Sequence, residues 1–282
     1  MSSPLRIAIV GGGNIGSSLA LKFVTVGKHD VTVVARPSSK RLAQLRNHGI
    51  VTTQGESCKV AVADTLDVTV RYDLVIITTT GIQAEPLLPL LKQSAAKIIL
   101  FMFNIYDPER LRDMFGERAA FGFPFIQAML NDDGLLQASY SMKSSLGDQR
   151  CVDIFTSSAI PAALEPKMLL WSRSHTSLAI AMLGATWHES RTVATGMYAS
   201  LALTTSMGYQ LYPAPLKVIN WLPTPIVTGL LWLFSRMKEV RDQLGTATSV
   251  SECHAVIDTV VATAQQANKL SVISALQAIK SL

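Results

Sequence analysis

Apolar and polar positions follow a regular order over the first 160 residues of the chain. Four short, mainly apolar runs are typical of parallel strands that helices cover on both faces: RIAIV at 6–10, DVTVVAR at 30–36, DLVIITTT at 73–80 and KIILFMFN at 97–104. The stretches after them place apolar residues at helical spacing, and residues 50–66 have a hairpin-like pattern. This alternation of strand and helix predicts an α/β fold with a doubly wound, Rossmann-type sheet.

The pattern changes after residue 165. Apolar residues then recur at helical spacing, and no strand-like alternation remains. A connector with Pro161 and Pro166 precedes the change. We therefore expect two domains, an α/β domain over residues 1–165 and an all-helical domain over residues 166–282.

One segment of the helical half, VINWLPTPIVTGLLWLF at 218–234, contains no charged residue. Pro223 and Pro225 interrupt it, and it is shorter than the ~20 apolar residues that a membrane span needs. We expect a buried or groove-lining helix and no membrane partner. Attachment to a membrane surface and a contact with a second copy of the chain stay open as alternatives.

The composition is that of a folded protein with small-molecule partners. Hydrophobic residues make up 49% of the 282 residues and charged residues 16%, which excludes a disordered chain. The net charge of +5 comes from scattered Lys and Arg, so we expect an anionic small ligand and no nucleic acid. Three widely spaced cysteines indicate neither disulfides nor a zinc site, so we expect no metal and a reducing compartment. The start of the chain has no signal-peptide pattern, and we therefore expect a cytoplasmic location.

The first strand runs into a glycine-rich turn. Gly11, Gly13 and Gly16 fit the pattern G-x-G-x-x-G between a strand and a helix, with Asn14 and Ile15 inside it. In that context the glycines permit a tight turn, a close approach of backbone amides to a diphosphate, and tight packing of the helix on the strand. The helix N-terminus also favours an anion. The sequence predicts a dinucleotide site here; the alternative is a tight turn that binds nothing.

The end of the second strand indicates which dinucleotide. NAD-binding domains place Asp or Glu there to bind the ribose hydroxyls, whereas this chain has Arg36, followed by Ser38 and Lys40. Ser39 and Arg41 belong to the same cluster. A guanidinium with hydroxyls nearby suits a 2′-phosphate. We therefore predict NADP(H) as cofactor, against the alternative that these are ordinary solvated surface charges.

Several pieces of the chain together resemble the ketopantoate reductase (2-dehydropantoate 2-reductase) family. The resemblance rests on IAIVGGGNIGSSLA, VTVVAR, DLVIITTTGIQAEPLLPLL, LFMFNIYDPERLRDMFG and ECHAVIDTVVATAQQANKLSVISALQAI. It implies an NADP-binding Rossmann domain at 1–165, a helical substrate and dimerisation domain at 166–282, and an active site in the cleft between them. It also implies a homodimer that reduces a 2-keto acid with NADPH.

The family's motifs match this chain in part. The family's Val-Lys-x-x-Gln pattern corresponds to the stretch after the third strand, where Thr79 precedes Thr80 in the place of Lys, and Gln83 matches. The family's Gln-Asn-Gly is matched by Asn104 alone, which the resemblance places beside the nicotinamide and the substrate carbonyl. Its alternative is a strand-end Asn in a turn.

The helix at residues 171–181 departs from the family. The family has Lys, then Asn four residues on, then Asn-Pro, and this chain has none of them; Arg173 and His175 are its polar candidates. Carbonyl reduction needs a proton donor and a group that stabilises the oxyanion, so we predict His175 as the acid and Arg173 as the anion clamp. Two residues apart, they do not share a helical face. The alternatives are an Arg on a solvent face and a His paired with a carbonyl.

Glu252 lies at or next to the position where the family uses a Glu to bind substrate hydroxyls. It either binds substrate or is a first-turn carboxylate favoured by the helix dipole.

These residues predict an NADPH-dependent oxidoreductase that reduces a carbonyl or imine of a small organic acid or hydrophobic metabolite, and not ketopantoate itself, because the family's Lys and Asn residues are missing. The alternative is a non-redox protein on the same scaffold: a nucleotide-bound sensor or partner protein, or a cyclase or isomerase that uses an apolar cleft.

Overall fold

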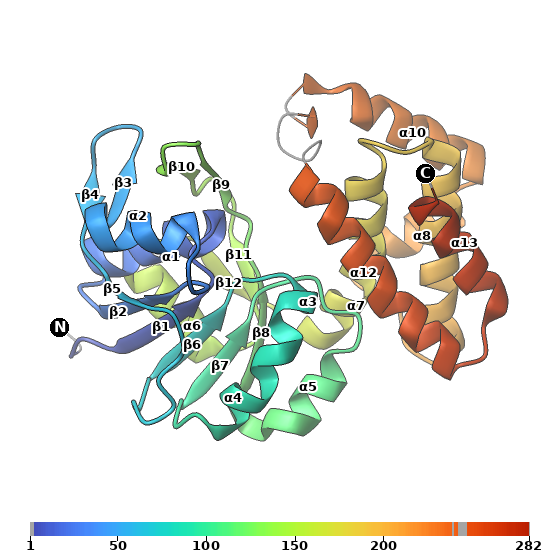
Figure 1. Cartoon of the computed structure of the whole chain (residues 1–282). Coiled ribbons are helices and arrows are strands. Elements are labelled where there is room, and N and C mark those ends of the chain that lie inside the picture. Colours follow the sequence, from blue (N-terminus) through green and yellow to red (C-terminus); the bar gives the residue numbers. More distant parts are fainter. Residues whose placement is uncertain (1–2, 239, 242–246, 282) are drawn as a thin grey trace. The chain divides into compact units, whose positions relative to one another are not determined.

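The computed structural model describes residues 3–238, 240–241 and 247–281. The chain forms two compact units. The first unit contains Met1–Phe103 and Glu109–Met168, and the second contains Asn104–Pro108 and Leu169–Leu282 (Figure 1). The chain therefore enters the second unit briefly at Asn104–Pro108 before it crosses over at residue 169, a return that the sequence pattern does not indicate.

The main sheet of the first unit has the strand order β12-β11-β8-β7-β6-β1-β2-β5. Its strands are β1 (Arg6–Val10), β2 (Asp30–Val34), β5 (Ala61–Ala63), β6 (Leu74–Ile77), β7 (Ile98–Phe101), β8 (Ala119–Phe123), β11 (Ser144–Leu146) and β12 (Ala162–Leu164). From β5 to β8 all neighbours are parallel, whereas β11 is antiparallel to β8. The predicted α/β fold with a parallel sheet is confirmed.

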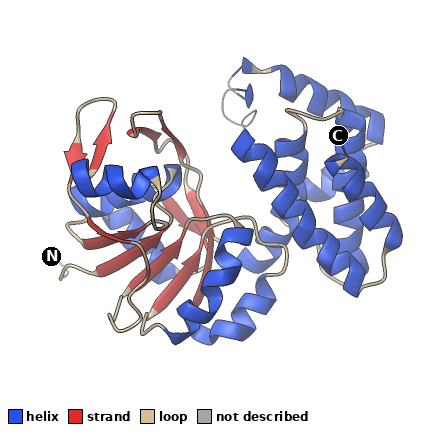
Figure 2. Ribbon diagram, in the orientation of Figure 1, coloured by secondary structure: helices blue, strands red, loops and turns tan. Residues whose placement is uncertain are grey.

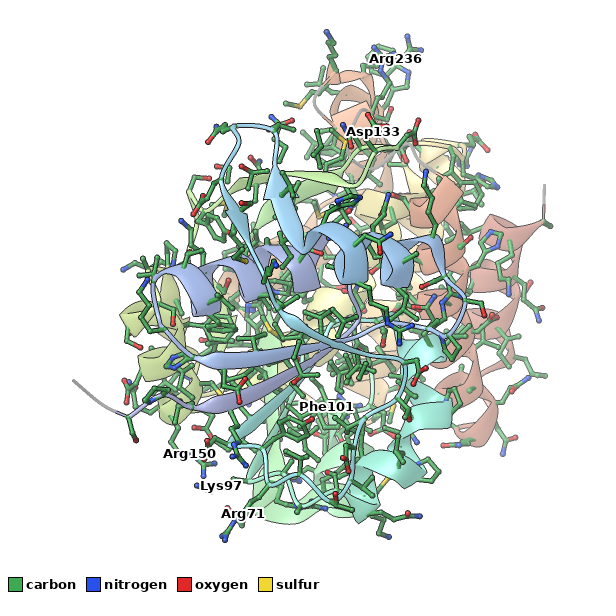
Figure 3. All side chains as sticks on the ribbon, turned by 60° about the vertical axis from the view of Figure 1, so that its left-hand side comes forward. Arg71, Lys97, Phe101, Asp133, Arg150 and Arg236 are labelled. Carbon is green, nitrogen blue, oxygen red and sulfur yellow. The ribbon has the colours of Figure 1, made fainter. Side chains whose placement is uncertain are left out.

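Helices cover both faces of this sheet (Figure 2). They are α1 (Asn14–Thr25), α2 (Lys40–His48), α3 (Gly81–Ala84), α4 (Leu88–Gln93), α5 (Pro108–Phe115) and α6 (Gln149–Ser157), with 3₁₀ turns at Glu85–Leu87 and Gly116–Arg118. Phe23 of α1 packs edge-on against Phe155 of α6, with the ring centroids 5.4 Å apart. Phe101 lies inside the unit (Figure 3), where its ring contacts those of Phe115 and Phe121.

A second sheet, with the order β4-β3-β10-β9, was not predicted from the sequence. It contains β3 (Ile50–Thr52), β4 (Ser57–Cys58), β9 (Gln127–Leu130) and β10 (Leu135–Ser139). The hairpin-like pattern of residues 50–66 divides between the sheets: β3 and β4 form an antiparallel pair, and β5 joins the main sheet. Strands β3 and β4 have only three and two residues, and β9 and β10 bury few of their side chains, so these strands lack the continuous apolar run that identifies the strands of the main sheet.

The described part of the second unit is helical, as predicted. Its helices are α7 (Met168–Gly184, which starts in the first unit), α8 (Ser190–Ser206), α9 (Ala214–Trp221), α10 (Thr224–Arg236), α12 (Ala247–Gln266) and α13 (Leu270–Lys280). Helices α8, α12 and α13 share an apolar core. Gly196 permits the close packing of α8 on α13, because a Cβ there would collide with Ile279.

The expectation of one buried or groove-lining helix at residues 218–234 is wrong in part. The segment forms α9 and α10, which are bent by 116° at the break before Pro223. Only Val227 and Leu231 are buried in α10, and many of its other apolar side chains are exposed. Among the described helices none is long and apolar enough to cross a membrane by itself; α9 and α10 together pass that test on length and composition.

Candidate functional site

In the turn between β1 and α1, two glycines are required because a side chain at either position would collide with the protein itself. Gly11 has φ +118°, and a Cβ on it would lie 2.7 Å from the hydroxyl of Thr78. A Cβ on Gly16 would collide with the carbonyl oxygen of Gly11. Gly11 thus makes the sharp turn, and Gly16 lets α1 pack against it.

Gly13 is different, because a Cβ on it would meet no atom within 4 Å. It is the N-cap residue of α1 and supplies no side chain to bind the free amides of the first turn. Close by, the hydroxyl of Thr79 is buried and has no hydrogen-bond partner among the described residues. Open space before a helix N-terminus, with an unsatisfied hydroxyl beside it, fits the diphosphate of a dinucleotide.

The loop after β6 meets this turn. Strand β1 lies between β2 and β6, so the order of the sheet reverses at this point. The hydroxyl of Thr78 donates to the carbonyl oxygen of Gly11 at 3.0 Å. Thr80 is the N-cap of α3, and Gln83 is exposed on that helix. Ligands of such sheets bind at this reversal, outside the carboxyl ends of the strands.

The basic cluster after β2 divides into separate roles. Arg36 and Ser38 are exposed, and Ser38 has φ +59°. Ser39 caps α2 by accepting from the amide of Leu42 at 3.1 Å. The ammonium group of Lys40 donates to the carbonyl oxygen of Asp132 at 2.6 Å. Arg36 is therefore the exposed cation at the carboxyl end of β2.

Arg41 has a role that the sequence analysis did not predict. Its Nε donates to the carbonyl oxygen of Gly12 at 2.9 Å, its Nη2 to Oγ of Ser17 at 2.9 Å, and its Nη1 to the carbonyl oxygen of Gly134 at 3.2 Å. Burial lowers the pKa of this guanidinium. Arg41 thus ties the glycine turn to the β9–β10 hairpin, a contact between segments 93 positions apart that no local pattern indicates.

Asn14 also holds this hairpin, since its Oδ1 accepts from the amide of Leu130 at 3.1 Å. Ile15 is half-buried and packs against the core of the first unit. The two residues inside the glycine pattern therefore support the shape of the turn.

Two further predicted residues meet in the second unit. The amide nitrogen of Asn104 donates to Oε1 of Glu252 at 3.0 Å, while Oδ1 of Asn104 is buried and has no partner among the described residues. Burial raises the pKa of Glu252, although the bond from Asn104 acts in the opposite direction. Glu252 is the sixth residue of α12, so the alternative of a first-turn carboxylate is wrong. The pair can present a carboxyl group and an amide oxygen to one ligand.

Arg173 lies inside the second unit with 1% of its surface exposed. Its guanidinium lies 3.7 Å from the ring centre of Tyr209 and 5.6 Å from that of Tyr106. Its Nη2 is 3.7 Å from Oδ1 of Asp107. The alternative of an Arg on a solvent face is therefore wrong.

His175 has other neighbours than Arg173. Its ring stacks on that of Trp171, with the centroids 4.3 Å apart and the planes inclined by 10°. Burial lowers its pKa to about 4, so the imidazole is neutral at pH 7. An imidazolium acid of the kind predicted needs a higher pKa than this. The catalytic roles of His175 and Arg173 stay predictions.

Comparison with known proteins places these residues in a family. The model of the family described as ketopantoate reductase PanE/ApbA matches residues 7–148. The curated proteins gave no match.

Solved structures resemble the chain over nearly its whole length. A PanE/ApbA family ketopantoate reductase from Ralstonia eutropha has a TM-score of 0.73 at 14% identity, over 98% of this chain and 97% of that one. A 2-dehydropantoate 2-reductase from Geobacter metallireducens has 0.70 at 17%, over 98% and 99%. A D-mandelate dehydrogenase in complex with NADH has 0.71 at 16%, over 98% and 97%. At these low sequence identities the solved structures show a common fold only. The family model shows the family, because it matches half of the sequence. The chain belongs to the ketopantoate reductase PanE/ApbA family.

Proposed function

We propose that the chain is an NADPH-dependent reductase of a carbonyl or imine in a small organic acid or hydrophobic metabolite. The family and the neighbours indicate a nicotinamide-dependent oxidoreductase of the ketopantoate reductase type. The observation that carries the proposal is the turn at Gly11–Gly16, where Gly13 faces open space at the N-terminus of α1. This turn binds the cofactor's diphosphate through the amides of α1, with Thr79 as a further hydrogen-bond partner.

Arg36 supports NADPH over NADH. It is exposed and close to the hydroxyl-bearing Ser38, whereas Lys40 and Arg41 bind backbone carbonyls. A guanidinium pairs well with a 2′-phosphate, while a ribose hydroxyl gains little from it. The neighbouring D-mandelate dehydrogenase is described with NADH, so the choice of cofactor must be measured for this chain.

The test is a fluorescence titration of NADPH and NADH against the protein and its Arg36→Ala variant. We expect NADPH to bind more tightly, and Arg36→Ala to weaken NADPH binding about 10- to 100-fold while NADH binding changes little, because a hydrogen bond to a charged group contributes about 1.5–3 kcal/mol. Arg46→Gln, on the exposed face of α2, is the matched control. Equal affinity for both cofactors would remove the argument for NADPH, and affinity for neither would remove the proposal.

The remaining roles fall to residues of the second unit. NADPH, when bound, supplies the hydride. Asn104 and Glu252 bind a polar group of the substrate, and the raised pKa of Glu252 lets this carboxyl keep its proton to a higher pH than an exposed one. The buried guanidinium of Arg173 supplies positive charge for an anionic group of the substrate. The neutral imidazole of His175 can donate a hydrogen bond to the substrate.

The substrate differs from ketopantoate in this proposal. Helix α7 lacks the Lys and Asn residues of the family pattern, and its Arg173 lies between two tyrosine rings. A panel of keto acids and hydrophobic ketones, assayed for NADPH oxidation, should therefore favour the hydrophobic ketones. Robust turnover of ketopantoate would overturn this expectation.

A non-redox protein is the second candidate. It is favoured by the low pKa of His175, because the neutral imidazole holds no readily transferred proton at pH 7, and by the enclosure of Arg173, because a guanidinium does not give up its proton. Tight NADPH binding without oxidation by any carbonyl in the panel, unchanged by Arg173→Ala or His175→Ala, would support this candidate over the reductase.

The proposal includes a homodimer. One structural neighbour, from Staphylococcus aureus, is described as a dimeric ketopantoate reductase and has a TM-score of 0.66. Sedimentation velocity gives the oligomeric state of this chain directly.

A further inference from the structure

Helices α9 and α10 expose an unusual amount of apolar surface. Half of the large apolar side chains that are exposed in the described residues lie between positions 218 and 237. Those on the outer side are Val218, Trp221, Ile226, Leu230, Leu233 and Met237, with exposed fractions from 49% to 87%. We call these six residues the apolar ridge.

The ridge follows a single face of α10. Ile226, Leu230, Leu233 and Met237 are four, three and four positions apart, the spacing of one helical face. Val227 and Leu231 point to the core of the second unit instead. Helix α10 therefore has both a buried apolar strip and an exposed one, so packing within the unit does not account for the ridge.

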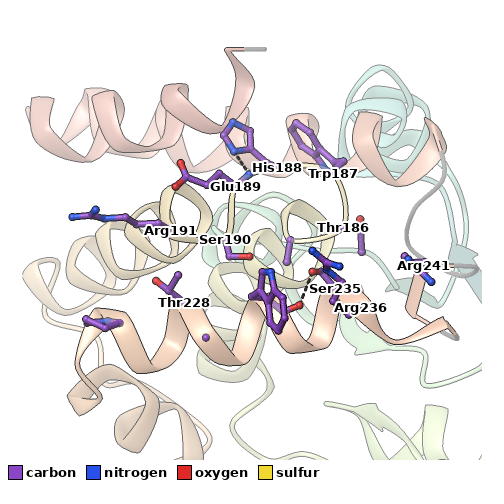
Figure 4. A pocket seen from close by; sticks show the side chains of 14 residues that line it. Thr186, Trp187, His188, Glu189, Ser190, Arg191, Thr228, Ser235, Arg236 and Arg241 are labelled. Carbon is purple, nitrogen blue, oxygen red and sulfur yellow. Dashed lines mark hydrogen bonds between the residues drawn. The ribbon is translucent and has the colours of Figure 1, made fainter.

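A third strip of α10 lines a pocket of about 700 Å³ against the start of α8 (Figure 4). Trp187 and Trp232 contribute aromatic surface to it. Arg191, Arg236 and Arg241 also line it, and the guanidinium of Arg236 lies 4.8 Å from the ring centre of Trp232. The pocket therefore combines cations with aromatic rings, directly beside the apolar ridge.

The charged residues around the ridge are mainly cations among the described residues. Between positions 214 and 238 the sequence contains Lys217, Arg236 and Lys238 and no Asp or Glu. The next carboxylates in the sequence, Glu239 and Asp242, lie outside the described residues, and Glu189 is the acidic residue of the pocket lining. Such a surface has an apolar centre and a cationic border. Its binding partner should have an apolar interior and an anionic border.

We propose that the α9–α10 surface docks on anionic phospholipid membranes. The apolar ridge enters the boundary between headgroups and acyl chains, with Trp221, which is 87% exposed, at the break between the helices. Arg236, Arg241 and Lys217 bind the lipid phosphates. This attachment to the membrane surface is independent of the proposed reductase activity.

A second copy of the chain fits this surface less well. In a symmetric dimer built on the ridge, each patch meets its own copy. Because the border is mainly cationic, most of its cations would then lie near cations of the other copy, which is unfavourable. An anionic bilayer has the opposite charge at the same positions.

The experiment is flotation of the full chain with vesicles of phosphatidylcholine alone and of an equimolar mixture with phosphatidylserine. We expect binding to the mixed vesicles, weaker binding at high salt, and a blue shift of the tryptophan emission that Trp221→Phe reduces. Arg236→Gln should lower vesicle binding about fivefold, the effect of one cation near a charged bilayer. The double variant Leu230→Ser and Leu233→Ser should lower vesicle binding by about tenfold or more, because two apolar side chains that would insert into the bilayer are removed.

The controls are Leu270→Ser, which changes a 78% exposed leucine on α13, and Lys269→Gln, which removes an exposed cation beside it. Both should bind vesicles like the parent chain. Ridge variants that bind like the parent, or equal binding to pure phosphatidylcholine, would each overturn the proposal. A loss of dimers in sedimentation velocity without a change in vesicle binding would show that the ridge contacts a second copy. Because every exchanged side chain is exposed, circular dichroism should confirm an intact fold.

Discussion

His175 and Glu252 show how burial acts on two kinds of ionisable group. Burial disfavours the charged form of each, so it lowers the pKa of the imidazole and raises that of the carboxyl. The sequence identifies both residues as candidates but gives the direction of neither shift. At pH 7 the neutral form of His175 follows from its burial inside the helical unit, where its ring also stacks on that of Trp171.

The shift of His175 predicts a stability that depends on pH. Its pKa is about 4 in the folded chain and 6.5 ordinarily, so between these values the unfolded chain binds a proton that the folded chain does not. The free energy of unfolding should therefore fall as the pH drops from 6.5 to 4, by about 2 kcal/mol at pH 4.5. Urea unfolding of the parent chain and His175→Gln at pH 7 and pH 4.5 measures this.

The comparison isolates the histidine, because Glu252 has the opposite pH dependence and is present in both proteins. His48→Gln, which changes an exposed histidine at the end of α2, is the control and should behave like the parent chain. A parent chain and a His175→Gln variant that respond equally to pH would contradict the predicted effect.

At the scale of elements, the β9–β10 hairpin supports the cofactor turn. Lys40 and Arg41 of α2 donate to carbonyl oxygens of Asp132 and Gly134, and Asn14 accepts from Leu130. The hairpin turn, where Figure 3 marks Asp133, therefore fixes both the start of α1 and the start of α2. This strand pair thus shapes the turn of the proposed dinucleotide site.

This arrangement predicts that Arg41→Lys weakens both stability and NADPH binding. Lysine keeps the charge but cannot make the forked contacts to Gly12, Ser17 and Gly134. We expect a loss of about 3 kcal/mol or more in unfolding free energy, because hydrogen bonds of a charged group contribute about 1.5–3 kcal/mol each and only one of the three can be retained. Thermal unfolding, NADPH titration and amide exchange at residues 131–134 measure the effect.

Arg46→Gln, on the same helix but in an exposed ion pair with Asp64, is the control and should change stability by less than about 1 kcal/mol. If Arg41→Lys behaves like this control, the guanidinium fork is not what holds the turn.

For the whole molecule, the segment Asn104–Pro108 explains why the boundary between the units is not a single position. This segment follows β7 but packs with the helices of the second unit. The buried hydroxyl of Tyr106 bonds to Ser200 and Thr204 of α8, and Arg173 of α7 lies near Asp107. Asn104 is thereby placed beside Glu252, 148 positions away. The sequence analysis assigned residues 1–165 to cofactor binding and residues 166–282 to substrate binding and dimerisation. These assignments stay predictions.

The sequence by itself determined the βαβ order, the buried strands β1, β2, β6 and β7, the glycine turn and the helical second half. These features depend on side-chain periodicity and on steric limits of the backbone, which act between near neighbours in the chain. Only the tertiary structure decided the partners of Arg41, the pairing of Asn104 with Glu252, the enclosure of Arg173 and the exposed ridge of α9 and α10. Each of these depends on contacts, or on uncovered faces, between segments far apart in the sequence, and burial and pKa shifts arise only when such segments pack together.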